Sequence, residues 1–341
     1  MLELDVTNAV DYLRHAGVFE PGEAAAASCL AGGVSNVVLR VDSEHRSIVL
    51  KQSRAKLRTH ADWFSNLDRI FREADVMRAL RPKLAGAVVP EVLFEDRANF
   101  AFAMSAAPRA HHVWKRLLLN GQADQEIAGH AGDILGTIHA TTAGDAQLAH
   151  QFSDHTVFIQ LRVEPFYWRL RPIHPEQSHR IDAIVREMWQ CRTALVHADF
   201  SPKNVLVHAQ GVTLVDYETG HWGDPAFDLG FFLSHLVLKA IKHSQQRQAF
   251  ANLTRRFWDR YRDRLRPVLA GHPALALGEL TRRAIGHFSL CALARIDGTS
   301  PVDYLPEQSK RAAVRHLARE LLDREVSCWE LVLEQLNSLD P

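Results

Sequence analysis

A short segment at 195–207 reads LVHADFSPKNVLV and contains an aspartate followed five residues later by an asparagine. An apolar run then leads into an Asp-Tyr-Glu sequence. Transfer of a phosphoryl group to a hydroxyl needs an acceptor for the hydroxyl proton and oxygen ligands for Mg²⁺. We therefore predict that Asp199 is the catalytic base and that Asn204, Asp216 and Glu218 are metal ligands.

The same Asp-x-x-x-x-Asn spacing occurs in the catalytic loop of protein kinases. Aspartate and asparagine also favour turns, which would explain one or two of these residues but not their order beside two apolar runs. We predict that His197 and Lys203 support the loop. Asp224 followed by Pro225 is typical of a helix start, and we expect Asp228, in the first turn, to hydrogen-bond the loop backbone.

Residues that suit nucleotide phosphates occur in the first quarter of the chain. A glycine pair lets backbone amides approach phosphate oxygens, although such a pair is also an ordinary turn, and this alternative stays open. Lys51 is a charge within an apolar run, and we expect it to bind phosphates and to pair with Glu73 on the next helix. The predicted loop residues are Gly32, Gly33, Ser35 and Asn36.

The elements that must position these residues differ between the start of the chain and the rest. Alternating apolar residues predict strands at 35–41 and 47–51, joined as a hairpin, and at 88–94 and 99–104, while helical periodicity follows at 63–80. Beyond Pro108 helical patterns dominate, which indicates an α+β fold of two lobes with a cleft between them. The long helical patterns cover 125–141, 181–191, 227–242, 245–266, 274–294 and 307–336.

Composition excludes several classes of function. The 40 basic and 40 acidic residues give a formal net charge of zero, so we expect no binding to nucleic acids. The four cysteines show no CxxC spacing and no HExxH motif occurs, which argues against zinc. We expect no membrane partner and a cytoplasmic location, since the chain has no long apolar run. A homodimer stays open.

These motifs resemble the aminoglycoside phosphotransferase and choline kinase superfamily, which is protein-kinase-like. The resemblance runs from about Cys29 to Leu236. It implies a protein-kinase-like fold with a five-stranded β-rich N-lobe at 1–105, which binds the nucleotide, and a mainly helical C-lobe at 106–341, which carries the catalytic loop, metal and acceptor sites. It also implies ATP and Mg²⁺ as cofactors, with the adenine near Met104.

Within the superfamily, the N-lobe is most similar to the methylthioribose kinases. The shared features are the GGVSN loop, the LKQ strand, the Asp-x-Glu motif and the segment from Trp63 to Glu73. The catalytic loop, DFSPKN, is closer to the general superfamily form. Candidate substrate contacts are Trp222, Arg295 and Asp297, although Arg295 and Asp297 also suit a turn that caps a helix.

The sequence therefore predicts an ATP- and Mg²⁺-dependent kinase that phosphorylates a hydroxyl group of a small molecule, a sugar or polyol similar to methylthioribose. Two alternatives remain. One is an aminoglycoside phosphotransferase, although the arginines of the last third do not suit a polycationic acceptor. The other is a pseudokinase that binds nucleotide without turnover, which the complete set of catalytic positions disfavours.

Overall fold

The computed structural model describes residues 1–30, 36–54, 66–324 and 326–339. The chain forms two compact units. The first consists of Met1–His111 together with His208–Thr219, and the second of His112–Val207 and Gly220–Pro341. The first unit therefore includes a later segment that follows the catalytic-loop motif, in addition to the N-terminal part.

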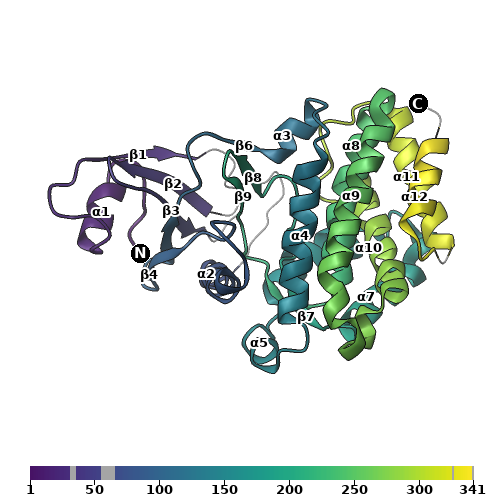
Figure 1. Ribbon diagram of the computed structural model, residues 1–341, viewed down its shortest axis with the longest axis horizontal. Helices are drawn as coiled ribbons and strands as arrows, with labels where there is room; N and C mark the ends of the chain where they lie inside the picture. The colour runs from purple at the N-terminus through teal and green to yellow at the C-terminus, as the bar shows by residue number, and fades with distance from the viewer. Residues whose placement is uncertain (31–35, 55–65, 325, 340–341) are drawn as a thin grey trace. The chain divides into compact units, whose positions relative to one another are not determined.

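The first unit is built on a five-stranded antiparallel sheet with the order β1-β2-β3-β5-β4 (Figure 1). The predicted hairpin is present, because β2 pairs with β3 in the register Asn36↔Ser53 to Asp42↔Ser47. The elements of this unit are α1 Ala9–His15, β1 Ala25–Cys29, β2 Asn36–Ser43, β3 Ser47–Ser53, α2 Arg69–Leu80, a 3-10 turn Arg81–Lys83, β4 Val92–Asp96, β5 Ala101–Ser105 and β9 Gly211–Leu214.

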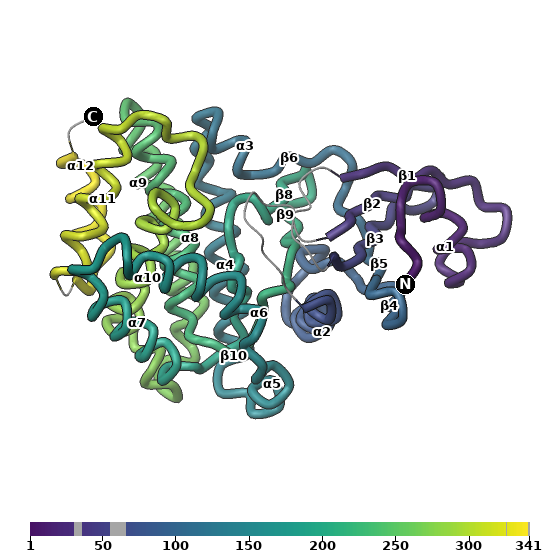
Figure 2. The backbone as a smooth tube through the Cα atoms, turned by 180° about the vertical axis from the view of Figure 1, so that it is seen from behind, coloured from purple at the N-terminus to yellow at the C-terminus, as the bar shows by residue number. Residues whose placement is uncertain are grey.

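The two faces of this sheet have different roles. On one face, Ile48 and Leu50 of β3 join a buried apolar cluster with Leu13 of α1 (Figure 2 shows α1 beside β1). Side chains alternate along a strand, so Lys51 points to the opposite face. Helix α2 packs against β3 and β5 and provides Glu73 there. The sheet thus places the buried Lys51 side chain next to the buried Glu73 side chain.

The second unit is mainly helical. Its long helices pack in the order α4, α9, α8, α10, α11 (Figure 1). Its elements, with the strands β6 and β8 that border it, are β6 His111–Val113, α3 Trp114–Leu119, α4 Gln125–Thr142, α5 Ala146–Gln151, α6 Thr156–Phe158, a π-helix Ile159–Tyr167, α7 Ser178–Gln190, β7 Ala194–Val196, β8 Val205–His208, β10 His221–Gly223, α8 Pro225–Lys242, α9 Arg247–Leu265, α10 Leu277–Asp297, α11 Gln308–Asp323 and α12 Trp329–Ser338. Short 3-10 turns lie at Trp168–Leu170, Pro175–Gln177, Ser244–Gln246, Arg266–Gly271 and Pro273–Leu275.

Helix α8 is the centre of the second unit. It is buried along almost its whole length, which fits its continuous apolar sequence. Gly230 lets α10 approach closely, because a Cβ at this position would lie 2.4 Å from the carbonyl oxygen of Ala284. The first turn of α8 directly follows β10, which pairs antiparallel with β7. This pairing places the helix start beside the catalytic-loop segment that follows β7.

The predicted α+β class is confirmed, but several local predictions differ from the structure. The helix expected at 63–80 begins at Arg69, since 66–68 are not helical, and the strand expected at 88–94 is β4 Val92–Asp96. The single helix expected at 307–336 is two helices, α11 and α12, which an extended Arg324 and Cys328 separate. Strand β1 was not predicted. No described helix is long and apolar enough to cross a membrane.

Candidate active site

Lys51 and Glu73 form a buried ion pair in the first unit. The Lys51 Nζ atom lies 2.6 Å from Glu73 Oε2 and 2.8 Å from Oε1, and 3.3 Å from Asp216 Oδ1. Burial lowers the pKa of Lys51, but the neighbouring carboxylates outweigh it and hold that pKa above its ordinary value. Lys51 is therefore a fixed cation, held by an acid on α2.

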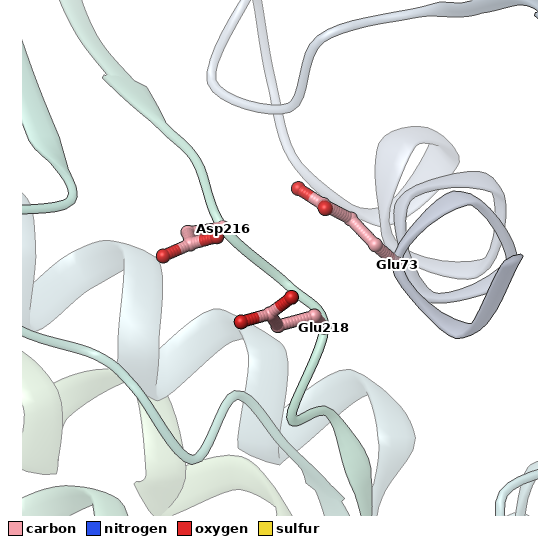
Figure 3. Close-up of side chains that lie close together, drawn as sticks. All are labelled: Glu73, Asp216 and Glu218. Atoms are coloured by element: carbon pink, nitrogen blue, oxygen red, sulfur yellow. The ribbon is translucent and has the colours of Figure 1, made fainter. Parts of the chain in front are cut away.

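Asp216 and Glu218 lie beside this pair. Figure 3 shows their carboxylates and that of Glu73 converging from the segment after β9 and from α2. Oxygen atoms of the three groups lie within 4.8 Å of one another. Asp216 adopts a φ of 73°, a left-handed conformation that costs free energy for a residue with a side chain.

Two buried side chains hold Glu218 in place. Its Oε2 atom accepts a hydrogen bond of 3.1 Å from Asn36 Nδ2 and one of 3.3 Å from Arg69 Nε. Arg69 Nη2 also donates to Asn36 Oδ1 at 3.3 Å. Asn36, which the sequence predicts to contact the nucleotide, thus hydrogen-bonds Glu218, one of the three clustered carboxylates.

The three clustered carboxylates have the chemistry of a Mg²⁺ site. Mg²⁺ prefers hard oxygen ligands and is commonly held by one or two carboxylates together with phosphate oxygens. Burial raises the pKa of Glu73, and the nearby charges of Asp216 and Glu218 raise it further against the opposing effect of Lys51. A cation that binds Asp216 and Glu218 would relieve this crowding of negative charge, so the donor set fits the metal.

In the second unit, Asp199 is a buried carboxylate with three polar partners. Its Oδ1 atom lies 2.6 Å from Arg162 Nη2, and its Oδ2 atom lies 2.9 Å from Lys203 Nζ and 2.8 Å from Asn204 Nδ2. Burial raises the pKa of Asp199, but the charges of Arg162 and Lys203 outweigh it and hold that pKa well below its ordinary range. Asp199 is therefore ionised at neutral pH.

Asp228 fixes the backbone that presents Asp199. Its two oxygens accept hydrogen bonds of 2.8 Å from the His197 amide and 2.7 Å from the Ala198 amide. Its Oδ2 atom also lies 3.2 Å from His139 Nε2. Ala198 has a φ of 59°, so the carboxylate secures a strained turn immediately before the acid.

His197 and Asn204 complete the loop. The Asp199 amide donates to His197 Nδ1 at 3.2 Å, and Asn204 Nδ2 donates to the Asp199 carbonyl oxygen at 2.9 Å. Lys203 is exposed and forms its ion pair with Asp199, four residues before it in the chain. The structure therefore gathers His197, Asp199, Lys203 and Asn204 with Asp228 in the second unit.

The remaining predicted residues have separate locations. Met104 is buried on β5, opposite Val49 in the register. Trp222 lies on β10, where its carbonyl oxygen accepts from His155 Nε2 at 2.9 Å. The Asp297 carboxylate pairs with Arg315 at 2.7 Å and with His174 at 3.0 Å, whereas Arg295 has no carboxylate partner among the described residues. Gly32, Gly33 and Ser35 lie outside the described residues.

Sequence reasoning missed two arginines that organise the site. Arg162 comes from an irregular π-helical stretch and also donates to the Ala198 carbonyl oxygen at 2.8 Å. No motif marks it. Arg69 stands four residues before Glu73, hence on the same helix face, and this spacing is a signal that could have identified it.

Comparison with known proteins gives a family model, described as "Phosphotransferase enzyme family", that matches residues 27–271. A methylthioribose kinase of Escherichia coli O45:K1 is 26% identical over 60% of this chain and 56% of its own length, so the match spans about half of that relative. A methylthioribose kinase of Bacillus mycoides is 20% identical over 97% of this chain and 95% of its own length. The structure of an ethanolamine kinase of Plasmodium vivax has a TM-score of 0.56 at 9% identity, covering 93% of this chain and 89% of that one.

Proposed function

Because the chain belongs to the phosphotransferase enzyme family, we propose that it transfers the γ-phosphate of ATP, with Mg²⁺, to a hydroxyl group of a small sugar or polyol. The observation that carries this proposal is the state of Asp199: a buried, ionised carboxylate held in one orientation by Arg162 and Asn204. Phosphoryl transfer relies on positioning and electrostatic stabilisation, which a fixed carboxylate provides.

The residues of the first unit suit the nucleotide side of the reaction. Lys51, held by Glu73, would bind phosphate oxygens of ATP, because a fixed ammonium group stabilises their negative charge. Asp216 and Glu218 would hold Mg²⁺, and Asn204 from the catalytic loop is the third proposed ligand. The bound metal would supply neutralisation of the phosphate charge. Met104 is proposed to lie near the adenine.

Asp199 would act on the acceptor. Its carboxylate orients the attacking hydroxyl and accepts the hydroxyl proton as the new O–P bond forms and the bond to the ADP oxygen breaks. Its low pKa keeps it ionised, so the proton moves late, when the hydroxyl has become acidic through bonding to phosphorus. Lys203, beside Asp199, would stabilise the charge of the transferred group.

Sequence similarity over nearly the full length supports a sugar hydroxyl as the acceptor, because methylthioribose is the substrate in the names of the relatives. As the sequence predicts, we propose that the N-terminal part at 1–105 binds the nucleotide and that the remainder at 106–341 binds the acceptor.

Calorimetric titration with ATP tests the nucleotide side directly. We expect binding that depends on Mg²⁺ and that weakens about tenfold or more in Lys51→Met, since a charge-assisted contact to phosphate is lost. Lys83→Met, in the 3-10 turn after α2, is the matched control and should bind as the wild type does. Equal affinity of Lys51→Met and wild type, or no binding by the wild type, would overturn the assignment.

A further inference from the structure

Three basic side chains of the second unit have no carboxylate partner among the described residues. They are Lys115 at the start of α3, Lys239 on α8 and Arg295 at the end of α10. Lys239 is fully buried, and Lys115 and Arg295 are half-buried. Lys239 Nζ donates to the carbonyl oxygen of His235 at 2.9 Å, and Arg295 Nη1 donates to that of Ser300 at 2.8 Å, but no described carboxylate neutralises these groups. Buried charges are costly unless they are neutralised, so this arrangement suits a bound anion.

Tyr304 lies close to all three of these side chains. Lys115 Nζ lies 6.0 Å and Lys239 Nζ 5.3 Å from the centre of its ring. Arg295 is also close enough to interact electrostatically with Tyr304. The Tyr304 hydroxyl and Arg295 Nε are buried atoms for which the described part of the chain provides no hydrogen-bond partner. These four side chains, Lys115, Lys239, Arg295 and Tyr304, form what we call the cation cluster.

The basic groups of the cation cluster lower one another's pKa. Burial lowers the pKa of Lys239 well below its ordinary value, and the charges of Lys115 and Arg295 lower it further. The pKa of Lys115 is lowered by burial and then by Arg295, against the opposing charge of Asp303. Asp303 is exposed at the surface and does not pair with either group in the described structure.

The cation cluster adjoins the catalytic loop of the same unit. The Lys115 amide donates to the carbonyl oxygen of Pro202 at 2.9 Å. Arg295 lies within electrostatic range of Asp199 and of Arg162, the arginine that binds Asp199. A molecule whose hydroxyl reaches Asp199 would therefore bring its other end near the cluster.

We propose that the acceptor is an acidic molecule, a hydroxyl compound whose carboxylate or phosphate group binds at the cation cluster. This inference rests on the proposed function and specifies its substrate class. Arg295 Nε and the Tyr304 hydroxyl donate hydrogen bonds to the anionic oxygens, and Lys115 supplies positive charge. The bound anion also favours the protonated form of Lys239, because an opposite charge nearby raises the pKa of an amine. A cationic acceptor, such as an aminoglycoside or choline, is repelled by the same groups.

Anion binding can be measured without knowledge of the natural acceptor. We would titrate inorganic phosphate into the full chain by calorimetry, with saturating Mg·ADP present so that the nucleotide site is filled. We expect one phosphate to bind, with affinity reduced about tenfold or more in Arg295→Met and in Lys115→Met. Arg295→Lys, which keeps the charge, should retain part of the affinity.

A matched control lies next to the cluster. Arg116 follows Lys115 on α3 but is exposed, so Arg116→Met should bind phosphate as the wild type does. The proposal is overturned if wild type binds no phosphate, if Arg116→Met loses as much affinity as Lys115→Met, or if Mg·ADP abolishes binding, which would assign the anion to the nucleotide site.

A turnover assay separates this proposal from the proposed function. ADP release is measured with ribose, ribonate, ribose 5-phosphate and choline as acceptors. We expect ribonate or ribose 5-phosphate to react, with KM raised in Arg295→Met and KM for ATP unchanged, and the more active of the two identifies the anionic group. A preference for ribose or choline overturns the acidic acceptor while the kinase function stands. An absence of ATP binding by the wild type refutes the kinase function. Phosphate is then titrated without Mg·ADP, and binding that weakens in Arg295→Met but not in Arg116→Met still supports the anion site.

Discussion

Replacement of Asp228 by alanine is a demanding test of how the catalytic loop is held. This carboxylate accepts hydrogen bonds from the amides of His197 and Ala198 and lies 3.2 Å from His139 Nε2. All of these groups are buried, so water cannot replace the lost oxygens without rearrangement. The substitution therefore leaves two backbone donors without acceptors at a strained turn.

The expected loss of stability follows from that count. Each buried donor left unsatisfied costs about 1–3 kcal/mol, so Asp228→Ala should lower the free energy of unfolding by about 2–6 kcal/mol. Asp228→Asn keeps one acceptor oxygen and should lose about half as much. As a control, Asp75→Ala removes an exposed carboxylate paired with Arg78 and should change stability by about 0.5 kcal/mol or less.

The assay combines urea unfolding with hydrogen exchange. Unfolding measured by circular dichroism gives the free energies, and exchange resolves whether the amides of His197 and Ala198 lose protection before the rest of the second unit. Because Asp228 acts through the loop, kcat should fall while affinity for Mg·ATP stays unchanged. Unfolding free energies within 0.5 kcal/mol of wild type, with those amides still protected, would refute the reasoning.

Two further predictions concern the helical core of the second unit. Gly230→Ala forces a Cβ to within 2.4 Å of a carbonyl oxygen of α10, so the free energy of unfolding should fall by about 1–3 kcal/mol in a thermal unfolding experiment. The control is Gly278→Ala, whose Cβ meets nothing within 4 Å and which should be neutral or slightly stabilising. Burial lowers the pKa of His287 from 6.5 to about 3, so its contribution to stability is complete above pH 6.5 and is lost as pH falls towards 3. His287→Gln should therefore reduce the dependence of unfolding free energy on pH between 6 and 4.5, by up to about 1.4 kcal/mol per pH unit, and an unchanged slope would contradict this account.

Much of the fold was predictable because it rests on local patterns. Alternating apolar residues identified the β2–β3 hairpin, and helical periodicity identified α4, α8, α9 and α10 close to their observed bounds. The family, the small-molecule phosphotransferase class and the protein-kinase-like fold predicted from the catalytic-loop motif are confirmed. The helices and the hairpin follow from residues near one another in sequence, and the family follows from short motifs between Cys29 and Leu236.

Other features lacked a local signal. Strand β1 reads AAASC and is mostly exposed, so it has no apolar alternation and forms only by pairing with β2. The amphipathic pattern of α11 continues into α12 without glycine or proline, which made two helices look like one. For β1, pairing with β2 rather than local propensity decides the structure.

The candidate site also contains residues with a local sequence signal and residues without one. The prediction of Asp199, Asn204 and Lys51 rests on residue spacing. Arg162, in contrast, reaches Asp199 from 37 residues earlier in the chain, through a π-helix that no sequence rule anticipates. The cation cluster is similar, because its members come from α3, α8, α10 and the segment after α10. Their proximity is a property of the fold and could not be read from any one segment.

The most direct test of the central claim is ADP release from Mg·ATP in the presence of the ribose-based acceptors and methylthioribose, with wild type and Asp199→Asn compared side by side. We expect wild type to turn over at least one acceptor and Asp199→Asn to lose about 100-fold or more in kcat while it still folds and binds Mg·ATP. Equal turnover by the two proteins, or ATP binding without ADP formation for every acceptor, would contradict the claim.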